Sequence, residues 1–363
     1  MRKLFFAAAF AAISTSAMAA PTDAGRYQVA LGDCEGCHGK NLAGGVVLTT
    51  PFGRMVTPNI TPDKDTGIGN YTAEDFARAM KAGIAPGGKL LYPAMPYPSY
   101  ARMSDADIAA LWAYMRTVKP VKHQVNVNQL NFPFNLRFMM RGWNMLFFAA
   151  TPYADNPAKS AALSGASLQG WFAPDLTSDQ GAGLGSWSAG DIVEYLQTGR
   201  NGHSLASGPM AEAVENSTSK MNDADLKAIA VYLKDLPASR GNGGGASGIE
   251  AQMKSGAILY DISCAACHGR DGKGSLIFPP LAGNPNLRQV RADSIVRMVL
   301  AGGRGAATAK APTGQGMPSF AWRLNDSQAA DILTYVRNNW GNRAPAVSPE
   351  TVGRIRSALH SGS

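Results

Sequence analysis

The chain has 363 residues, a formal net charge of +8 and 45% hydrophobic residues. This length exceeds one typical domain, and the basic residues form no cluster suited to nucleic acid, so nucleic acid is excluded as a partner. Forty glycines and 22 prolines predict a loop-rich architecture.

The N-terminus has the pattern of a secretory signal peptide. Two basic residues precede an alanine-rich apolar run at 4–13, and Ala17-Met18-Ala19 offers a cleavage site between small residues. An uncleaved anchor helix is the alternative, but the apolar run is shorter than the ~20 residues that span a bilayer. We therefore expect residues 1–19 to be removed and the mature protein to be periplasmic.

Two stretches read Cys-x-x-Cys-His, and together they contain all four cysteines of the chain. This pattern is typical of c-type haem attachment. Two thiols on one turn of helix reach the two haem vinyl groups, and the histidine that follows points at the iron as its proximal ligand. The sequence therefore predicts two covalently bound haems c, the first held by Cys34, Cys37 and His38 and the second by Cys264, Cys267 and His268.

Zinc and disulfides are the alternatives for these cysteines. The two pairs lie too far apart in the sequence for a zinc-ribbon loop. Neither zinc nor two local disulfides explain a histidine directly after both pairs. Haem c is attached outside the cytoplasm in bacteria, which agrees with the signal peptide, so we favour haem at both stretches.

A helix start recurs three times along the chain. An apolar residue precedes Ser or Asn and an aspartate, and a tyrosine follows at a constant spacing, in segments that begin at Met103, Met221 and Leu324. Ser or Asn serves as the N-cap, and the apolar residue before it acts as a hydrophobic staple. We expect each segment to form the last helix of a repeat, and this helix to pack against a first helix that carries the cysteines.

A second similarity joins the first two repeats, since 58–83 aligns without a gap to 174–199. The predicted fold class is mainly α, with tandem class I-type cytochrome c domains, of which the middle one is degenerate and haem-less. The predicted organisation is a signal peptide (1–19), a haem domain (20–122), a connecting segment (123–168), the degenerate repeat (169–240), a Gly-rich linker (241–248), a second haem domain (249–342) and a tail (343–363).

Class I-type haem domains take a second axial ligand, often methionine, from a loop before the last helix. Met95 and Met317 each precede a proline in such a loop. Most other methionines are expected to fill the core, with Met103 and Met298 as the alternative ligands. The predicted iron ligand pairs are therefore His38 with Met95 and His268 with Met317.

The middle repeat keeps the later half of the pattern, including Met210 where a ligand loop is expected, but it has no Cys-x-x-Cys-His. Its preceding segment, 151–170, is rich in Ala, Ser and Pro and lacks a convincing first helix. His203 is the nearby histidine, and a histidine in a Gly-rich loop is more often a polar contact than an iron ligand. We therefore predict no haem in the middle repeat.

The sequence resembles a known family, the cytochrome c subunits of bacterial membrane-bound alcohol, gluconate and sorbitol dehydrogenases. The resemblance covers nearly all of the mature chain and is carried by 91–97, 134–137, 143–144, 170–174, 199–201 and 207–210. It implies electron transfer from a partner dehydrogenase that carries PQQ or FAD to ubiquinone at the inner membrane. Family members are similar to three haem domains in tandem, and this chain departs from them at the middle haem, as if a segment near 158–168 had been removed.

Two functions stay open. One is the electron-transfer subunit of a dehydrogenase complex, and the other is a free periplasmic dihaem shuttle that serves an oxidase or a peroxidase. The sequence contains no recognisable nucleophile, acid–base pair or second cofactor motif, so the chain is not expected to act on an organic substrate by itself.

Two segments are candidates for membrane contact. Residues 136–150 are apolar but interrupted by Arg137 and Arg141, which suits either a peripheral element on the inner membrane or a packing segment between domains. The tail predicts a helix that begins at Ser348. One face of this helix, which can dock on the protein or on lipid, carries Val352, Ile355 and Leu359.

Overall fold

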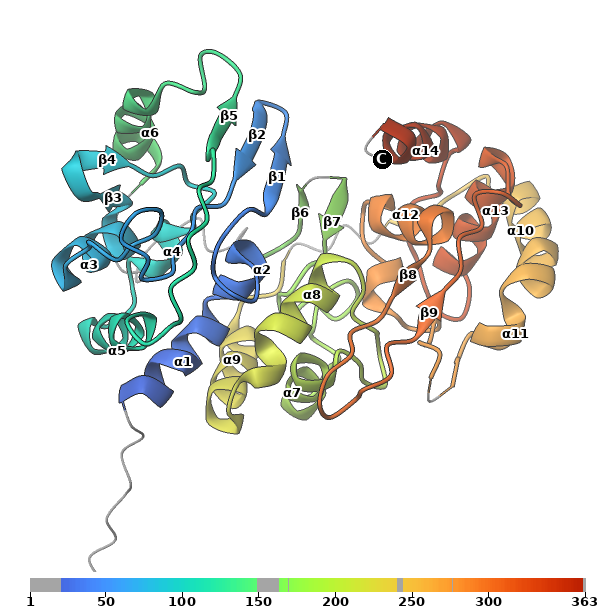
Figure 1. Cartoon of the computed structure of the whole chain (residues 1–363). Helices are drawn as coiled ribbons and strands as arrows, with labels where there is room; N and C mark the ends of the chain where they lie inside the picture. Colours follow the sequence, from blue (N-terminus) through green and yellow to red (C-terminus); the bar gives the residue numbers. More distant parts are fainter. Residues whose placement is uncertain (1–20, 149–162, 169, 240–243, 276, 362–363) are drawn as a thin grey trace, which may run out of the picture. The chain divides into compact units, whose positions relative to one another are not determined.

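The computed structural model describes residues 21–148, 163–168, 170–239, 244–275 and 277–361. The predicted signal peptide lies outside these residues, as do parts of the predicted connecting segment and Gly-rich linker. The described chain is mainly α-helical with short antiparallel ladders (Figure 1), which confirms the prediction of a mainly α fold.

Contacts divide the chain into two compact units. Unit 1 contains 1–29 and 41–150, and unit 2 contains 30–40 and 151–363. The first attachment motif therefore belongs to unit 2, together with the middle and third repeats.

Unit 1 holds most of the first repeat. Its helices are α1 (Pro21–Leu31, whose last two residues belong to unit 2), α3 (Ala73–Ala82), α4 (Tyr97–Tyr100), α5 (Asp105–Met115) and α6 (Met140–Phe147), with 3-10 turns η1 (Pro86–Gly88) and η2 (Arg137–Met139). Its strands are β1 (Val47–Thr50), β2 (Gly53–Val56), β3 (Ile84–Ala85), β4 (Lys89–Leu90) and β5 (Asn128–Leu130). Strands β1, β2 and β5 form one antiparallel sheet in that order, and β3 pairs with β4.

Unit 2 begins with the short helix α2 (Cys34–His38). The middle repeat follows with β6 (Ala166–Leu168), β7 (Trp171–Ala173), α7 (Ala189–Thr198), α8 (Pro209–Asn216), η5 (Thr218–Lys220) and α9 (Asp223–Asp235). The third repeat contains α10 (Glu250–Ser263), α11 (Ala265–His268), η6 (Pro285–Leu287), α12 (Asp293–Ala301), β8 (Gly303–Arg304), β9 (Gly316–Met317), α13 (Asp326–Arg337) and α14 (Pro349–Ser361). Strand β6 pairs with β7 and β8 pairs with β9, both antiparallel.

The three predicted helix starts are confirmed. Ser104, Asn222 and Asn325 are the N-caps of α5, α9 and α13, and each side chain accepts a hydrogen bond from a backbone N–H of the first turn. These bonds satisfy donors that a helix N-terminus leaves unpaired. Helices α3 and α7 begin in the same way, with capping boxes at Thr72 and Ser188.

In the first and third repeats a first helix crosses the last helix at a glycine. A Cβ on Gly25 of α1 would lie 2.0 Å from the carbonyl oxygen of Ala110 in α5. A Cβ on Gly256 of α10 would lie 2.3 Å from the carbonyl oxygen of Asp331 in α13. Because glycine has no Cβ, it permits this close approach of two helix backbones. The predicted packing of the last helix on the first is thus present in both repeats. The cysteines, however, do not lie on the first helices α1 and α10, but in or directly before the short helices α2 and α11 that follow them.

The tail helix α14 docks on the third repeat. Val352 and Ile355 are 0% and 4% exposed and belong to the same apolar cluster as α10, α12 and α13. Arg354 adds an ion pair, with its Nη2 3.1 Å from Oδ1 of Asp293. Of the two alternatives for the tail, protein and lipid, the structure shows the protein.

Candidate haem-binding sites

The first Cys-x-x-Cys-His motif forms α2, directly after α1. Asp33 caps this helix in the left-handed conformation, with φ 48°, and its carboxylate accepts a hydrogen bond from the N–H of Gly36 at 3.2 Å. The short helix places Cys34 and Cys37 on one turn and buries His38, which is 8% exposed. This is the local geometry that two thioether bonds and a proximal histidine require.

Helix α2 packs on the middle repeat within unit 2. The carbonyl oxygen of Leu31 accepts a hydrogen bond from Oγ of Ser217 at 3.2 Å. The Glu35 carboxylate lies 3.7 Å from Nζ of Lys220. Ser217 directly follows α8 and Lys220 ends η5, so the middle repeat contacts the segment that carries the first attachment motif.

The second motif forms the end of α10 and α11. Nδ1 of His268 lies 3.1 Å from the carbonyl oxygen of Pro279. Because a carbonyl oxygen can only accept, Nδ1 carries the proton, and the lone pair of Nε2 is left for a metal ion. Burial lowers the pKa of His268, which favours the neutral imidazole that binds metals.

The four cysteine side chains are free thiols. Burial is the main reason why the pKa of Cys34 is raised to about 12 and that of Cys264 to about 11. Across the described ranges, no three His, Cys, Asp or Glu side chains are grouped as ligands of a metal ion. Paired free thiols followed directly by a histidine fit covalent attachment of haem c at both motifs, and at the second motif Nε2 of His268 is available to the iron.

Met95 lies in a tight turn between β4 and α4. Its N–H donates to the carbonyl oxygen of Tyr92 at 3.0 Å, and its carbonyl oxygen accepts from the N–H of Tyr97 at 2.7 Å. Its side chain is half-buried. His38 belongs to unit 2 and Met95 to unit 1, so their pairing at one iron stays a prediction.

Met317 lies in β9, opposite Gly303 of β8. The alternative ligand Met298 reaches the same glycine, since its Sδ would lie 2.9 Å from a Cβ on Gly303. The structure thus brings both candidate methionines of the third repeat to one place. Met317 as the ligand of the second iron stays a prediction.

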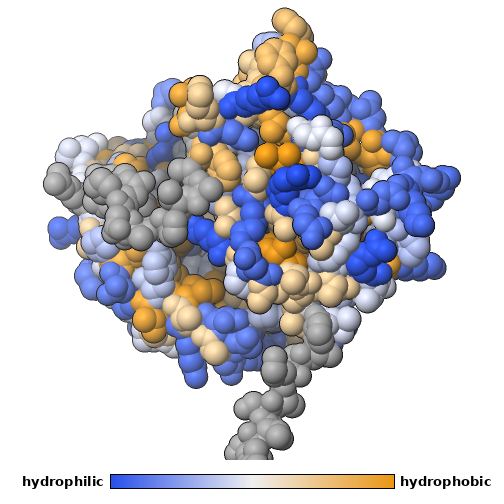
Figure 2. Space-filling view, turned by 90° about the vertical axis from the view of Figure 1, so that its left-hand side faces the viewer, coloured by the Kyte–Doolittle hydropathy of each residue, from blue (hydrophilic) through white to orange (hydrophobic). Residues whose placement is uncertain are grey.

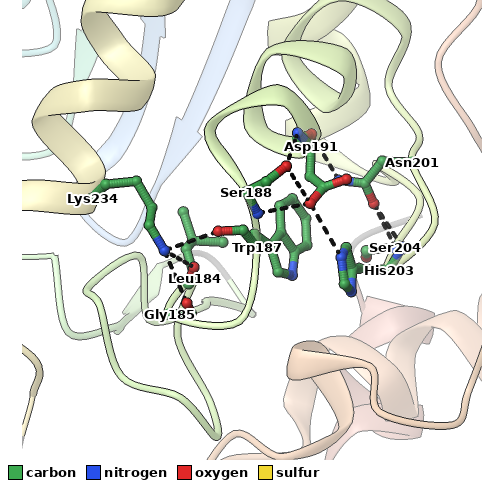
Figure 3. A network of polar contacts seen from close by, with 9 residues as sticks. All are labelled: Leu184, Gly185, Trp187, Ser188, Asp191, Asn201, His203, Ser204 and Lys234. Atoms are coloured by element: carbon green, nitrogen blue, oxygen red, sulfur yellow. Dashed lines mark hydrogen bonds and ion pairs between the residues drawn. The ribbon is translucent and has the colours of Figure 1, made fainter.

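Figure 3 shows the surroundings of His203 in the middle repeat. Its ring stacks on Trp187 with a centroid distance of 5.2 Å, and its Nε2 lies 3.4 Å from Oδ2 of Asp191. Asn201 fixes the loop, because its Oδ1 accepts from the N–H groups of His203 and Ser204 at 2.9 and 3.0 Å. His203 is therefore engaged in the polar contact that its Gly-rich loop indicates.

Sequence analysis does not single out a basic residue at the end of each last helix. Arg116, Lys234 and Arg337 follow their N-caps at the same spacing, and each donates to backbone carbonyl oxygens of an earlier loop. In Figure 3, Nζ of Lys234 lies 2.9 Å from the carbonyl oxygens of both Gly185 and Trp187. A search for cations in the last turn or at the C-cap of each helix would have found them, because the helix dipole favours positive charge there. We call these three residues the basic clamps.

Comparison with known proteins decides the family. A sequence model of the cytochrome c family matches residues 23–119 and 253–340, the two segments that contain the attachment motifs. The chain is 36% identical to the cytochrome c subunit of alcohol dehydrogenase (quinone) of Gluconobacter oxydans, over 92% of this chain and 81% of that protein. The chain belongs to the family of dehydrogenase cytochrome c subunits.

Two further relatives of this cytochrome subunit carry different names. The gluconate 2-dehydrogenase cytochrome c subunit of Pantoea cypripedii is 36% identical, over 92% of this chain and 88% of that protein. A diheme cytochrome c-type protein of Cereibacter sphaeroides is 34% identical, over 57% of this chain and 83% of that protein. The resemblance to the alcohol and gluconate dehydrogenase subunits is thus confirmed, and the family implies covalently bound haem c.

Proposed function

We propose that this cytochrome subunit carries two haems c and transfers electrons from a PQQ- or FAD-dependent dehydrogenase toward ubiquinone, on the periplasmic side of the inner membrane. The observation that carries the proposal is the pair of attachment helices, α2 and α11, each ending in a histidine. Relatives that are named as cytochrome c subunits of dehydrogenases support the partner. Haem c, when bound, supplies one-electron chemistry.

The residues of the chain hold and tune the two irons. With haem bound, the four cysteines would supply the covalent anchors, and His38 and His268 would each supply one iron ligand. The bond from Nδ1 of His268 to the Pro279 carbonyl oxygen orients the ring and raises its basicity as a ligand. Met95 and Met317 supply the second ligands, and a methionine thioether raises the reduction potential. A raised potential favours acceptance of electrons from a reduced dehydrogenase cofactor.

An apolar patch in unit 1 supports placement at the membrane surface. Figure 2 shows a face of the molecule with apolar side chains at the surface. The patch is defined by five residues whose exposed fractions range from 40% to 80%: Phe132, Phe134, Phe138, Met145 and Leu146. Such a cluster of large apolar side chains indicates an interaction surface, and its place on and beside α6 suits shallow, peripheral contact with lipid.

The positive charge of Arg137 is held by two contacts within unit 1. Its Nη1 donates to the carbonyl oxygen of Leu90 at 2.9 Å, and its guanidinium lies 4.6 Å from the centre of the Tyr92 ring.

In the part of the chain that the structure describes, no helix is long and apolar enough to cross a membrane.

Purification of the mature protein with its natural neighbours tests the function. We expect a large subunit with PQQ or FAD to co-purify, and its substrate to reduce first both haems and then a ubiquinone analogue. A chain that purifies alone and delivers electrons to an oxidase or peroxidase would be a free shuttle, the alternative that the diheme cytochrome relative favours.

Flotation with anionic phospholipid vesicles tests the apolar patch. We expect the double variant Phe138→Ser with Met145→Ser to lose most vesicle binding. The matched control, Ile258→Ser with Ile262→Ser, changes two exposed apolar side chains of α10 and should bind like the unmodified protein. Equal loss in both double variants would show that the patch is not the contact surface.

A further inference from the structure

The β-hairpins of the first and third repeats differ in length, and only the third carries its candidate methionine, Met317, on a strand. In the first repeat, β3 and β4 are joined by the three-residue turn η1. In the third repeat, β8 and β9 are joined by the much longer loop 305–315. A longer loop leaves its strands more freedom, so the third hairpin needs further contacts if Met317 is to keep a fixed position.

Within unit 2, the middle repeat supplies these contacts. Oε1 of Glu215, the penultimate residue of α8, accepts hydrogen bonds from Nη2 of Arg304 at 2.7 Å and from the N–H of Ala307 at 2.6 Å. Ser207 forms a β-bridge with Gly305. The haem-less repeat thus binds the hairpin at the end of β8 and in the first residues of the loop.

The Glu215 carboxylate is well placed for this task. Its side chain is 24% exposed, whereas that of Arg304 is 57% exposed, so solvent weakens the ion pair itself. The bond to the Ala307 N–H is half-buried and fixes the backbone directly. Arg304 pairs with Gly316 across the hairpin, next to the pair formed by Gly303 and Met317. Glu215 therefore binds the residue pair of the hairpin that is adjacent to the pair containing Met317.

We propose that Glu215 is a positioning residue for the second haem site, holding the β8–β9 hairpin so that Met317 stays on the iron bound by His268. This inference rests on the proposed ligand pair. A thioether is a weak ligand that competes with other ligands, so its occupancy depends on how firmly the protein presents it. Loss of the Glu215 contacts lowers the occupancy at this iron and leaves the first site unchanged.

Competition with imidazole measures this effect in the full, two-haem protein. We expect Glu215→Ala to raise the apparent imidazole affinity of the second haem roughly tenfold, the change expected for the loss of one charge-assisted hydrogen bond. Glu215→Gln keeps an acceptor for the Ala307 N–H and should give a smaller rise. The matched control is Glu194→Gln, which changes an exposed carboxylate of the same repeat and should have no effect.

The first haem is the internal reference, and Met317→Ala identifies which signal belongs to the second haem. Equal affinities in Glu215→Ala and the unmodified protein would overturn the inference. An equal rise at both haems, tracking a general loss of stability, would also overturn it. If Met317→Ala leaves both sulfur-to-iron bands intact, the ligand proposal itself fails. The two failures are therefore distinguishable.

Discussion

In the third repeat α10 covers α13, whereas the equivalent face of α9 in the middle repeat is exposed. Tyr335 of α13 packs against Tyr260 and Trp340, with ring centroids 5.5 Å apart in both pairs. Its counterpart in α9, Tyr232, is 54% exposed, and the neighbouring Val231 is 64% exposed. Among the described residues of the middle repeat, no first helix occupies this face.

The two repeats show which parts of the pattern depend on a haem-bearing first helix. Helix α9 keeps its Asn222 cap and buries its other face, with Leu226 and Ala230 at 0% exposure. Its basic clamp, Lys234, also persists. The last helix and its clamp therefore form without the attachment helix. In the third repeat the cysteines, the histidine and the crossing glycine all lie on the first helix or directly after it, so the loss of one segment is sufficient to remove all of them.

The largest difference between repeats should appear when their methionines are replaced by alanine. Met95→Ala and Met317→Ala should each abolish the sulfur-to-iron charge-transfer band of one haem and lower its potential by a substantial part of the ~0.8 V that axial ligands span. Met210→Ala, in the middle repeat, should change neither band. Visible spectra and redox titrations provide the measurement. Survival of both bands in the first two variants would show that other residues, such as Met103 or Met298, bind the irons.

The basic clamps should differ in strength between the two repeats. Arg337 is 1% exposed and donates to the buried carbonyl oxygens of Leu287 and Gln289, and burial lowers its pKa to about 10. We expect Arg337→Met to reduce the free energy of unfolding by about 3 kcal/mol, because it leaves both oxygens unpaired. Lys234→Met should cost less, about 2 kcal/mol, since its head group is partly solvated.

Urea unfolding of the two variants measures this difference, with the exposed Lys227→Met as the control. A larger loss for Lys234→Met than for Arg337→Met would contradict the comparison.

Replacement of the equivalent tyrosines of α13 and α9 should give a smaller difference in the free energy of unfolding. Tyr335→Ala should cost about 2 kcal/mol, because it removes ring contacts with Tyr260 and Trp340. Tyr232→Ala removes an exposed ring and should change stability by less than about 0.5 kcal/mol. Thermal unfolding followed by circular dichroism compares the two. Equal losses in the two variants would contradict this contrast.

The tail gives the smallest expected effect, and this effect depends on pH. Hydrogen bonds from Arg291 are the main reason why the pKa of Asp293 is lowered, and Arg354 of α14 adds to them. A lowered folded-state pKa means that the stabilisation is present above the ordinary Asp pKa of ~3.9 and is lost as the pH falls through the folded-state value.

Asp293→Asn should therefore cost about 1 kcal/mol at pH 7 and nothing at a pH where the unmodified carboxyl is protonated. Denaturant titrations at both pH values provide the check. A loss of unfolding free energy that does not depend on pH would mean that packing, and not the charge of Asp293, stabilises the docked tail helix.

Local rules were sufficient to predict the helices and the attachment motifs. Ser104, Asn222 and Asn325 cap helices where the sequence places them, because a cap depends on a few neighbouring residues. The Cys-x-x-Cys-His spacing likewise depends on a single helical turn. The mainly α fold class followed from these local patterns, whereas the family followed from the resemblance of other segments, such as 91–97 and 207–210.

Long-range partners could not be predicted in this way. The Pro279 carbonyl oxygen that orients His268 is a backbone atom and has no side-chain signature. The contacts of Glu215 with Arg304 and Ala307 join two repeats, and nothing in either segment identifies its partner. The direction in which α14 docks was also open, because an amphipathic helix can face protein or lipid equally well until its neighbours are known.

Intact mass spectrometry of the mature protein tests the proposal that the first and third repeats each carry one haem c and the middle repeat carries none. We expect a mass that exceeds the polypeptide by two haems. We further expect the loss of one haem in Cys34→Ala with Cys37→Ala, and of the other in Cys264→Ala with Cys267→Ala. A third haem, or a haem that survives the loss of its cysteine pair, would contradict the proposal.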